Sequence, residues 1–148
     1  TYAQSQGVKA HGMNLGGRYV FPFGSVKFVP ALHSSGYEID GVMTYMGEAS
    51  GIILEAEDKK IYHAGDTALF SDMRLFAKDK SIDVAFLPIG DNYTMGPEDA
   101  LEAVSYLNPE ITIPIHYNTF PVIQQNPAIF VEQVVGGKVL NPGETILV

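Results

Sequence analysis

The stretch Ile61-Tyr62-His63-Ala64-Gly65-Asp66-Thr67 decides how the rest of the sequence is interpreted. A β-prone run stops at Gly65, and glycine can take backbone geometries that other residues avoid. Asp66 is therefore expected at the end of a strand, where open α/β folds gather their ligands. Three other apolar runs end in a similar way, on His33, Asp91 and His116. The pattern predicts a metal site with Asp66 at its centre.

Around this stretch, the chain is predicted to run as strands first and then as alternating strands and helices, which makes the fold class α/β. The amphipathic spacing of Leu69, Met73, Phe76 and Ala77 predicts a helix directly after Asp66. Pro97 followed by acidic residues predicts the start of a second helix, which Asn108-Pro109 ends. The expected strands are residues 18–23, 25–32, 51–56, 60–63, 83–89, 111–115, 138–140 and 144–148. Residues 1–10 are expected to be the end of a helix with Gly7 as its C-cap, 127–134 a last helix, and 36–49 a loop with at most a short strand at 42–45.

Composition narrows the partners and the chemistry. The 148 residues carry 9 Lys and Arg against 17 Asp and Glu, a net charge of −8, which disfavours nucleic acid and anionic membranes as partners. No apolar run approaches the ~20 residues of a spanning helix, and no secretory signal opens the chain, so a cytoplasmic protein is expected. Since there is no cysteine, any metal must be held by histidine and carboxylate.

Each candidate ligand also has a structural interpretation. His33 and His116 could be ordinary strand-end histidines, and Asp66 could cap the helix that follows it. Asp91 competes with Asp66, because Ile89-Gly90-Asp91 repeats the same order of apolar residue, glycine and aspartate, and composition does not separate the two. His63 lies inside a strand and is a weaker candidate, and the role of His11 in its glycine-rich loop stays open. The joint pattern favours a metal site, since the strand ends of one sheet converge.

The sequence resembles a known family in several blocks that occur in the same order. Tyr62-His63-Ala64-Gly65-Asp66-Thr67 is similar to the metallo-β-lactamase fold and, more narrowly, to the UPF0173 metal-dependent hydrolases. The other matching blocks are residues 11–17, Ala31-Leu32-His33-Ser34-Ser35, residues 88–96 and Pro114-Ile115-His116-Tyr117-Asn118. Together they cover nearly all of the chain. The resemblance implies an αββα sandwich with a metal site at one edge of its two sheets.

The resemblance also implies the roles of individual residues. The histidine matching His33 binds a first divalent metal ion, the aspartate matching Asp66 bridges two ions, and the histidine matching His116 binds the second. Zinc is expected, with manganese and iron as alternatives. On this basis, and not from spacing, Asp66 is preferred to Asp91.

One departure from the family pattern bears on the whole interpretation. The leading signature of the family, His-x-His-x-Asp-His, is absent, and no His-x-His occurs anywhere in the chain. We therefore expect residues 1–148 to form the C-terminal portion of the fold, with its N-terminal half as the missing partner. Each metal ion would then find two of its protein ligands here, including the shared Asp66.

The expected reaction is metal-assisted hydrolysis of a small ester, lactone or phosphoester by a metal-bridged water. Asn118 or Tyr117 could donate a hydrogen bond to the oxyanion, and Thr67 or Ser34 could orient ligands, although a structural role is the commoner one for all four. The alternative is a non-catalytic fragment or interaction module with an incomplete metal site. A nuclease of the same fold is disfavoured by the net charge, and a homo-oligomer is left open.

Overall fold

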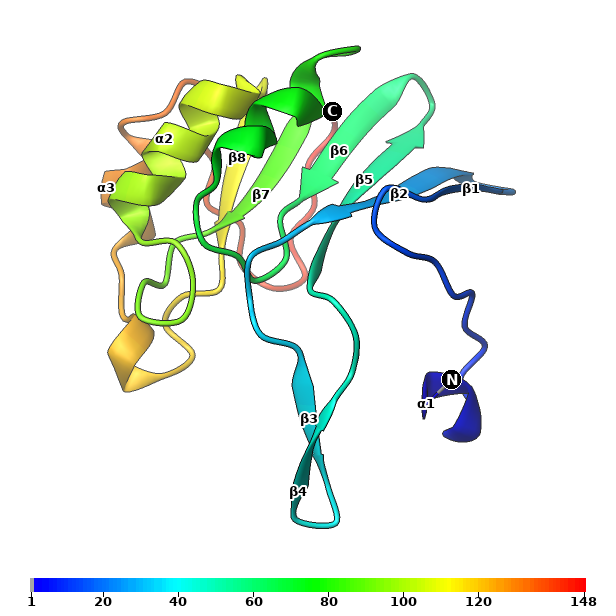
Figure 1. The fold of residues 1–148 in the computed structure, drawn as a ribbon. Coiled ribbons are helices and arrows are strands. Elements are labelled where there is room, and N and C mark those ends of the chain that lie inside the picture. The colour runs from blue at the N-terminus through cyan, green and yellow to red at the C-terminus, as the bar shows by residue number, and fades with distance from the viewer. Residues whose placement is uncertain (1) are drawn as a thin grey trace.

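A computed structural model describes residues 2–148, and its centre is a six-stranded mixed sheet (Figure 1). The strand order is β1-β2-β5-β6-β7-β8. Strands β1, β2, β5 and β6 pair antiparallel with one another in this order, whereas β6, β7 and β8 are parallel to one another. The strands of the sheet are β1 (Arg18–Phe21), β2 (Gly24–Pro30), β5 (Ser50–Ala56), β6 (Lys59–His63), β7 (Val84–Pro88) and β8 (Ile111–Ile115).

A second, two-stranded sheet projects away from this body. Strands β3 (Gly36–Ile39) and β4 (Val42–Tyr45) form a hairpin between β2 and β5, and Figure 1 shows it extending below the large sheet. The sequence predicts the strand at 42–45, but the prediction of a loop over 36–39 is wrong. Glycine and polar residues at 36–41 obscure the strand pattern, and pairing with β4 supplies the missing order.

Among the described residues, five helical segments complete the fold; α2 and α3 pack against the sheet, and η1 packs against α2 and, through Phe76, against Tyr62 of β6. The segments are α1 (Tyr2–Ser5), η1 (Ser71–Ala77), α2 (Pro97–Leu107), η2 (Pro121–Ile123) and α3 (Pro127–Val131). Helix α2 has Pro97 in its first turn and ends at Asn108, as predicted; Asn108 itself takes the left-handed conformation. In the described part of the chain, none of the helices has the length and apolar character needed to cross a bilayer.

The helix predicted after Asp66 is present as the 3₁₀-helix η1, and the Lys60 ammonium binds the carbonyl oxygens of Phe76 and Lys80, at 2.6 and 3.1 Å, near its C-terminal end. The two strands predicted near the end of the chain are corrected. The closing strands near 138–140 and 144–148 are absent among the described residues. There the chain meets β8 only around Thr112, and the Asn141–Glu144 turn then leads it away.

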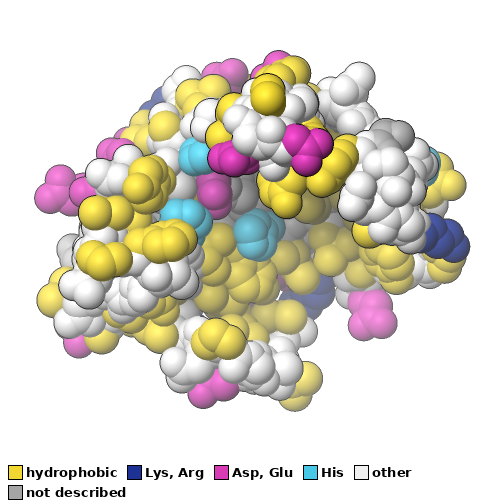
Figure 2. Space-filling model, turned by 90° about the horizontal axis from the view of Figure 1, so that it is seen from below, with side chains coloured by type: hydrophobic (Ala, Val, Ile, Leu, Met, Phe, Trp, Pro, Cys, Tyr) yellow, Lys and Arg dark blue, Asp and Glu magenta, His cyan; other side chains and the backbone are white. Residues whose placement is uncertain are grey.

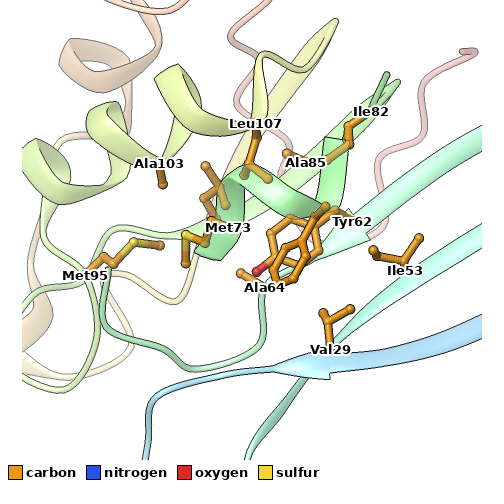
Figure 3. Close-up of a cluster of buried hydrophobic side chains, with 12 residues drawn as sticks. Val29, Ile53, Tyr62, Ala64, Met73, Ile82, Ala85, Met95, Ala103 and Leu107 are labelled. Atoms are coloured by element: carbon orange, nitrogen blue, oxygen red, sulfur yellow. The ribbon is translucent and has the colours of Figure 1, made fainter. Parts of the chain in front are cut away.

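The main core lies between the sheet and the helices (Figure 3). Tyr62 of β6 is fully buried and lies between Met73 of η1 on one side and Val29 and Ile53 on the other. Helix α2 contributes its apolar face through Ala103 and Leu107. A smaller cluster joins Ile89, Ala100, Phe130 and Val134.

The opposite face of the sheet is less well covered. Phe28, Ile52, His63 and Phe86 form one cross-strand row there, and each retains some exposure to solvent. Within residues 2–148 no helix packs over this row. The structure therefore contains one helix-covered sheet and a partly exposed apolar face.

A buried carboxylate fixes the pairing of β6 with β7 at the end opposite the predicted site. Asp83 accepts a hydrogen bond from the backbone N–H of Lys60 at 2.7 Å and lies 3.0 Å from the Lys59 ammonium. Burial alone would raise the pKa of Asp83, but these two partners together hold its pKa below the ordinary value of 3.8. The ionised form is therefore favoured in the folded state.

We predict that Asp83→Asn destabilises the protein by about 1 kcal/mol at neutral pH, because a charge-assisted bond becomes a neutral one. The lowered pKa means that this stabilisation is present above pH 3.8 and is lost as the pH falls through the folded-state pKa. Urea unfolding at neutral pH and well below pH 3.8 measures both effects. The exposed Glu132→Gln serves as the control, and an equal effect of the two variants at neutral pH would contradict the prediction.

Candidate metal centre

The strand topology brings the predicted ligands to one edge of the large sheet. Strand β2 runs in the same direction as β6, β7 and β8, because two antiparallel pairings relate β2 to β6 through β5. The loops after these four strands carry His33, Asp66, Asp91 and His116. The predicted convergence of strand ends is confirmed. Figure 2 views this end of the molecule and shows histidine and acidic side chains gathered around a hollow with hydrophobic walls.

Asp66 and His116 form the closest pair of candidate ligands. Oδ2 of Asp66 lies 3.5 Å from Nε2 of His116, and their side chains are 49% and 23% exposed. Two ligands bound to one ion at about 2.1 Å with a tetrahedral angle are about 3.4 Å apart. The pair is therefore spaced like two ligands of one divalent metal ion, and it is open to solvent.

A close backbone approach fixes the position of His116. The residue has a left-handed backbone with φ of 54°, which is uncommon outside glycine. A Cβ atom on Gly90 would lie 2.2 Å from the carbonyl oxygen of His116 and 3.3 Å from its Nδ1. Nδ1 itself is buried and has no hydrogen-bond partner in the described structure. Only glycine at position 90 leaves room for the backbone of His116 in this place.

His33 presents one defined nitrogen to solvent. Its Nδ1 lies 2.7 Å from the carbonyl oxygen of Ser34. A carbonyl oxygen can only accept, so in the neutral ring Nδ1 carries the proton and Nε2 keeps its lone pair. This is the arrangement that metal-binding histidines use when a backbone carbonyl orients them.

Thr67 connects the loop of His33 to the loop of Asp66. Its side chain is fully buried; its Oγ1 accepts from the backbone N–H of Leu32 at 3.0 Å and donates to the carbonyl of Ala68 at 2.8 Å. The backbone N–H of Ala68 donates in turn to the Leu32 carbonyl, and the N–H of Met95 donates to the Thr67 carbonyl. Three loops therefore meet at Thr67.

The three residues with open roles are distinguished by their hydrogen bonds and ring contacts. His63 accepts a bond from the Gly65 N–H on Nδ1, so in the neutral ring the proton lies on Nε2 and neither nitrogen offers a free lone pair. Burial lowers the pKa of His63, although the Asp66 carboxylate acts in the opposite direction. Asp91 uses Oδ1 to accept from the N–H of Asn92 within its own loop. His11 packs against Tyr19 and Phe21 at the far edge of the sheet.

The remaining sequence candidates mainly have structural contacts. Asn118 has φ of 61°, and its Oδ1 accepts from the Gln125 N–H at 2.8 Å, which leaves the Nδ2 amide group as a donor. Tyr117 packs on the smaller core cluster, and burial raises the pKa of its hydroxyl. The carbonyl oxygen of Ser34, not its hydroxyl, contacts His33.

The potential metal ligands of this chain gather at most in pairs within the described residues. Within residues 2–148, no three His, Asp or Glu side chains are gathered closely enough to hold one metal ion. The sequence did not predict two features that shape the site. One is the space that Gly90 leaves for His116, and the other is the connection between loops that Thr67 makes. A signal existed for Gly90, since it separates a buried strand from Asp91, but none existed for the partner of Thr67, which is 35 residues away.

The fold and this arrangement of ligands define a class of protein. Residues 1–117 match the β-lactamase superfamily domain, and the chain belongs to this family, with the metallo-β-lactamase fold predicted from the sequence. The family membership agrees with the mixed sheet and with candidate ligands at its strand ends.

Particular relatives are also similar along almost the whole chain. A UPF0173 metal-dependent hydrolase of Enterococcus faecalis is 99% identical over 147 residues, which cover 99% of this chain and 66% of the relative. One from Bacillus cereus is 53% identical over 150 residues, with the same two coverages. The solved structure of Igni18, a metallo hydrolase from Ignicoccus hospitalis, superposes with a TM-score of 0.84 at 36% identity, over 98% of this chain and 63% of that one. The chain therefore spans just under two thirds of the length of these relatives.

We predict that Thr67→Val lowers the free energy of unfolding by about 1–2 kcal/mol, because a buried hydroxyl and its two bonds are lost at constant shape. Thr67→Ser keeps the hydroxyl and should retain most of the stability. Urea unfolding of both variants tests this. Equal losses for valine and serine would show that the methyl group, and not the hydrogen bonds, holds the loops together.

We predict that Gly90→Ala costs about 1–3 kcal/mol and displaces His116, because the added methyl group overlaps the carbonyl oxygen of that residue. Thermal unfolding measures the cost, and the imidazole NMR resonances of His116 report the displacement. Gly12→Ala is the control, since nothing lies within 4 Å of the corresponding atom. Unchanged His116 resonances in Gly90→Ala would contradict the prediction.

Proposed function

We propose that the protein is a metal-dependent hydrolase that acts on a small-molecule substrate through metal-activated water. The observation that carries this proposal is the 3.5 Å pair of Asp66 and His116 at the strand ends of a β-lactamase superfamily fold. The names of the similar proteins, metal-dependent hydrolase and metallo hydrolase, support the same class of activity.

We propose that two divalent ions are bound, zinc being the expected metal and manganese or iron the alternatives. His33 would bind the first ion through Nε2, His116 would bind the second through Nε2, and Asp66 would contribute one carboxylate to both. Imidazole and carboxylate suit all three metals. The tautomer of His33 and the spacing of Asp66 from His116 support this assignment.

The ligands of this chain leave each ion with open coordination positions. Two protein ligands per ion fall short of the three or four that zinc uses. We propose that water and side chains from outside residues 1–148 fill these positions, as an N-terminal half of the same fold would.

The chemistry follows from the bound ions together with the residues around them. Divalent ions bound at this place would supply a water molecule of lowered pKa and a Lewis acid for the substrate oxygen. Asp66 and the two histidines would hold the ions there. Asn118 is proposed to donate a hydrogen bond from Nδ2 to the developing oxyanion, a role its free amide group permits. Esters, lactones and phosphoesters all suit such a site.

A non-catalytic interaction module is the second candidate function. It is favoured by the finding that no group of three potential ligands occurs within residues 2–148. The two candidates differ in metal content, since a catalytic site retains metal and a module does not. A content of zinc, manganese or iron well below one equivalent per chain, together with no hydrolysis of any ester, would favour the module.

We predict that Asp66→Asn lowers metal-dependent hydrolysis by at least about 100-fold, because a neutral amide cannot replace a shared carboxylate ligand. The matched control is Asp91→Asn, whose side chain keeps an oxygen to accept from Asn92 and which should retain activity. Metal content by mass spectrometry and turnover of 4-nitrophenyl acetate are measured for both. Near-normal turnover in Asp66→Asn, or equal losses in both variants, would refute the assignment of Asp66.

A further inference from the structure

A cavity of about 620 Å³ lies directly beside His33. It is formed where the β3–β4 hairpin leaves the body of the protein. Its lining residues are His33, Ser34, Ser35, Gly36, Met43, Tyr45, Gly47 and Glu48. The cavity thus shares one candidate metal ligand with the site, and the rest of its wall belongs to the hairpin and its two connections.

The hairpin is mounted as a continuation of two core strands. Pro30 of β2 pairs with Ser50 of β5, and the pairing is extended by a bond from the N–H of Ala31 to the carbonyl of Ala49. A further bond joins the N–H of Met46 to the carbonyl of Ser35. The strands that carry the hairpin therefore hold it at a fixed place relative to His33.

One side of the hairpin gives the cavity an apolar wall. Met43 and Tyr45 are two residues apart on β4, so they point to the same side. Met43 lies over Gly36, where an added Cβ would meet its sulfur at 3.0 Å, so the glycine makes room for this side chain. Both side chains are more than two-thirds exposed, 69% for Met43 and 68% for Tyr45, and neither belongs to a core cluster. Their apolar surface is therefore available to a bound molecule. Val42 points to the other side of the same strand and does not line the cavity.

The charge around the cavity is unfavourable to anions. None of its lining residues is Lys or Arg, whereas Glu48 adds a carboxylate that accepts from the Tyr45 hydroxyl at 2.5 Å. Several basic side chains lie instead at the opposite end of the sheet, where Lys59 pairs with Asp83 and Arg18 with Glu55. A bound phosphate would find no basic side chain of this wall to neutralise it, and an uncharged group would meet no such penalty.

We propose that this cavity is the substrate subsite for the apolar chain of a neutral ester or lactone, and that Met43 determines the preference for that chain. The proposal rests on the proposed function, and it selects among the substrates left open there. The reacting carbonyl would lie toward His33 and Asp66, with its hydrocarbon group against Met43 and Tyr45. Phosphodiesters are disfavoured by the absence of basic residues and the presence of Glu48.

Binding is tested first without metal, so that it does not depend on catalysis. The protein is labelled on its methionine methyl groups, stripped of metal and titrated with methyl hexanoate, and the same titration is repeated with the hexanoate anion. The Met43 resonance should move with the ester and much less with the anion. Met13, which lines the separate cavity beside His11, reports non-specific apolar binding, and the buried Met73 and Met95 serve as internal references.

Selectivity is tested with the metal-loaded protein on 4-nitrophenyl acetate, 4-nitrophenyl hexanoate and bis(4-nitrophenyl) phosphate. The hexanoate should exceed the acetate in kcat/KM by at least about tenfold, because several methylene groups gain an apolar wall. Met43→Ser should remove most of this preference and Met43→Leu should restore it. Val42→Ser, on the other side of β4, should leave the preference unchanged.

The two levels of the proposal fail in different ways. Movement of Met13 but not Met43, or the same chain-length preference in Met43→Ser as in the unchanged protein, overturns the subsite. Faster turnover of the phosphodiester than of the hexanoate overturns the substrate class. Absence of metal-dependent hydrolysis for all three compounds overturns the proposed function, and in that case the response of the Met43 resonance still decides whether the cavity binds apolar neutral molecules.

Discussion

The buried hydroxyl of Thr67 connects the parts of the protein that carry the candidate site. It accepts from the backbone of Leu32 and donates to Ala68, and the Thr67 carbonyl accepts from Met95. His33 and Asp66 each adjoin one of these residues in sequence, so their loops are held side by side by backbone contacts. A metal site needs its ligands placed to within a fraction of an ångström, and a buried, fully bonded side chain provides this better than an exposed loop does.

The same edge of the sheet concentrates unusual backbone. His116, Asn118 and Asp91 all have a positive φ, and Gly90 allows the backbone of His116 to approach closely. Such conformations carry a cost that well-packed surroundings must offset, and the core beneath Tyr62 and Ile89 supplies that packing. The stable end of the sheet, where Asp83 joins β6 to β7, is thus opposite the end where the backbone is strained and chemistry is expected.

Much of the fold followed from local patterns. Gly65 was predicted to take a special backbone geometry and has φ of 67°, and helix α2 starts and ends where Pro97 and Asn108 indicate. Local patterns failed at β3 and at the end of the chain. Glycine and polar residues obscured β3, although its partner β4 follows after two residues. Among the described residues, the end of the chain meets β8 only around Thr112, and this contact joins segments that are distant in the sequence.

By itself, the sequence determined the α/β class, the family resemblance and a short set of candidate ligands, because residue types and their order along strands are local properties. Only the tertiary structure brought Asp66 to 3.5 Å from His116, directed Nδ1 of His33 at the carbonyl oxygen of Ser34 and occupied Nδ1 of His63 with the Gly65 N–H. It also placed Met43 beside His33, although the loop prediction gave that segment no particular role. These are distances and hydrogen-bond directions between separate segments, and a chain acquires them only when its strands pair.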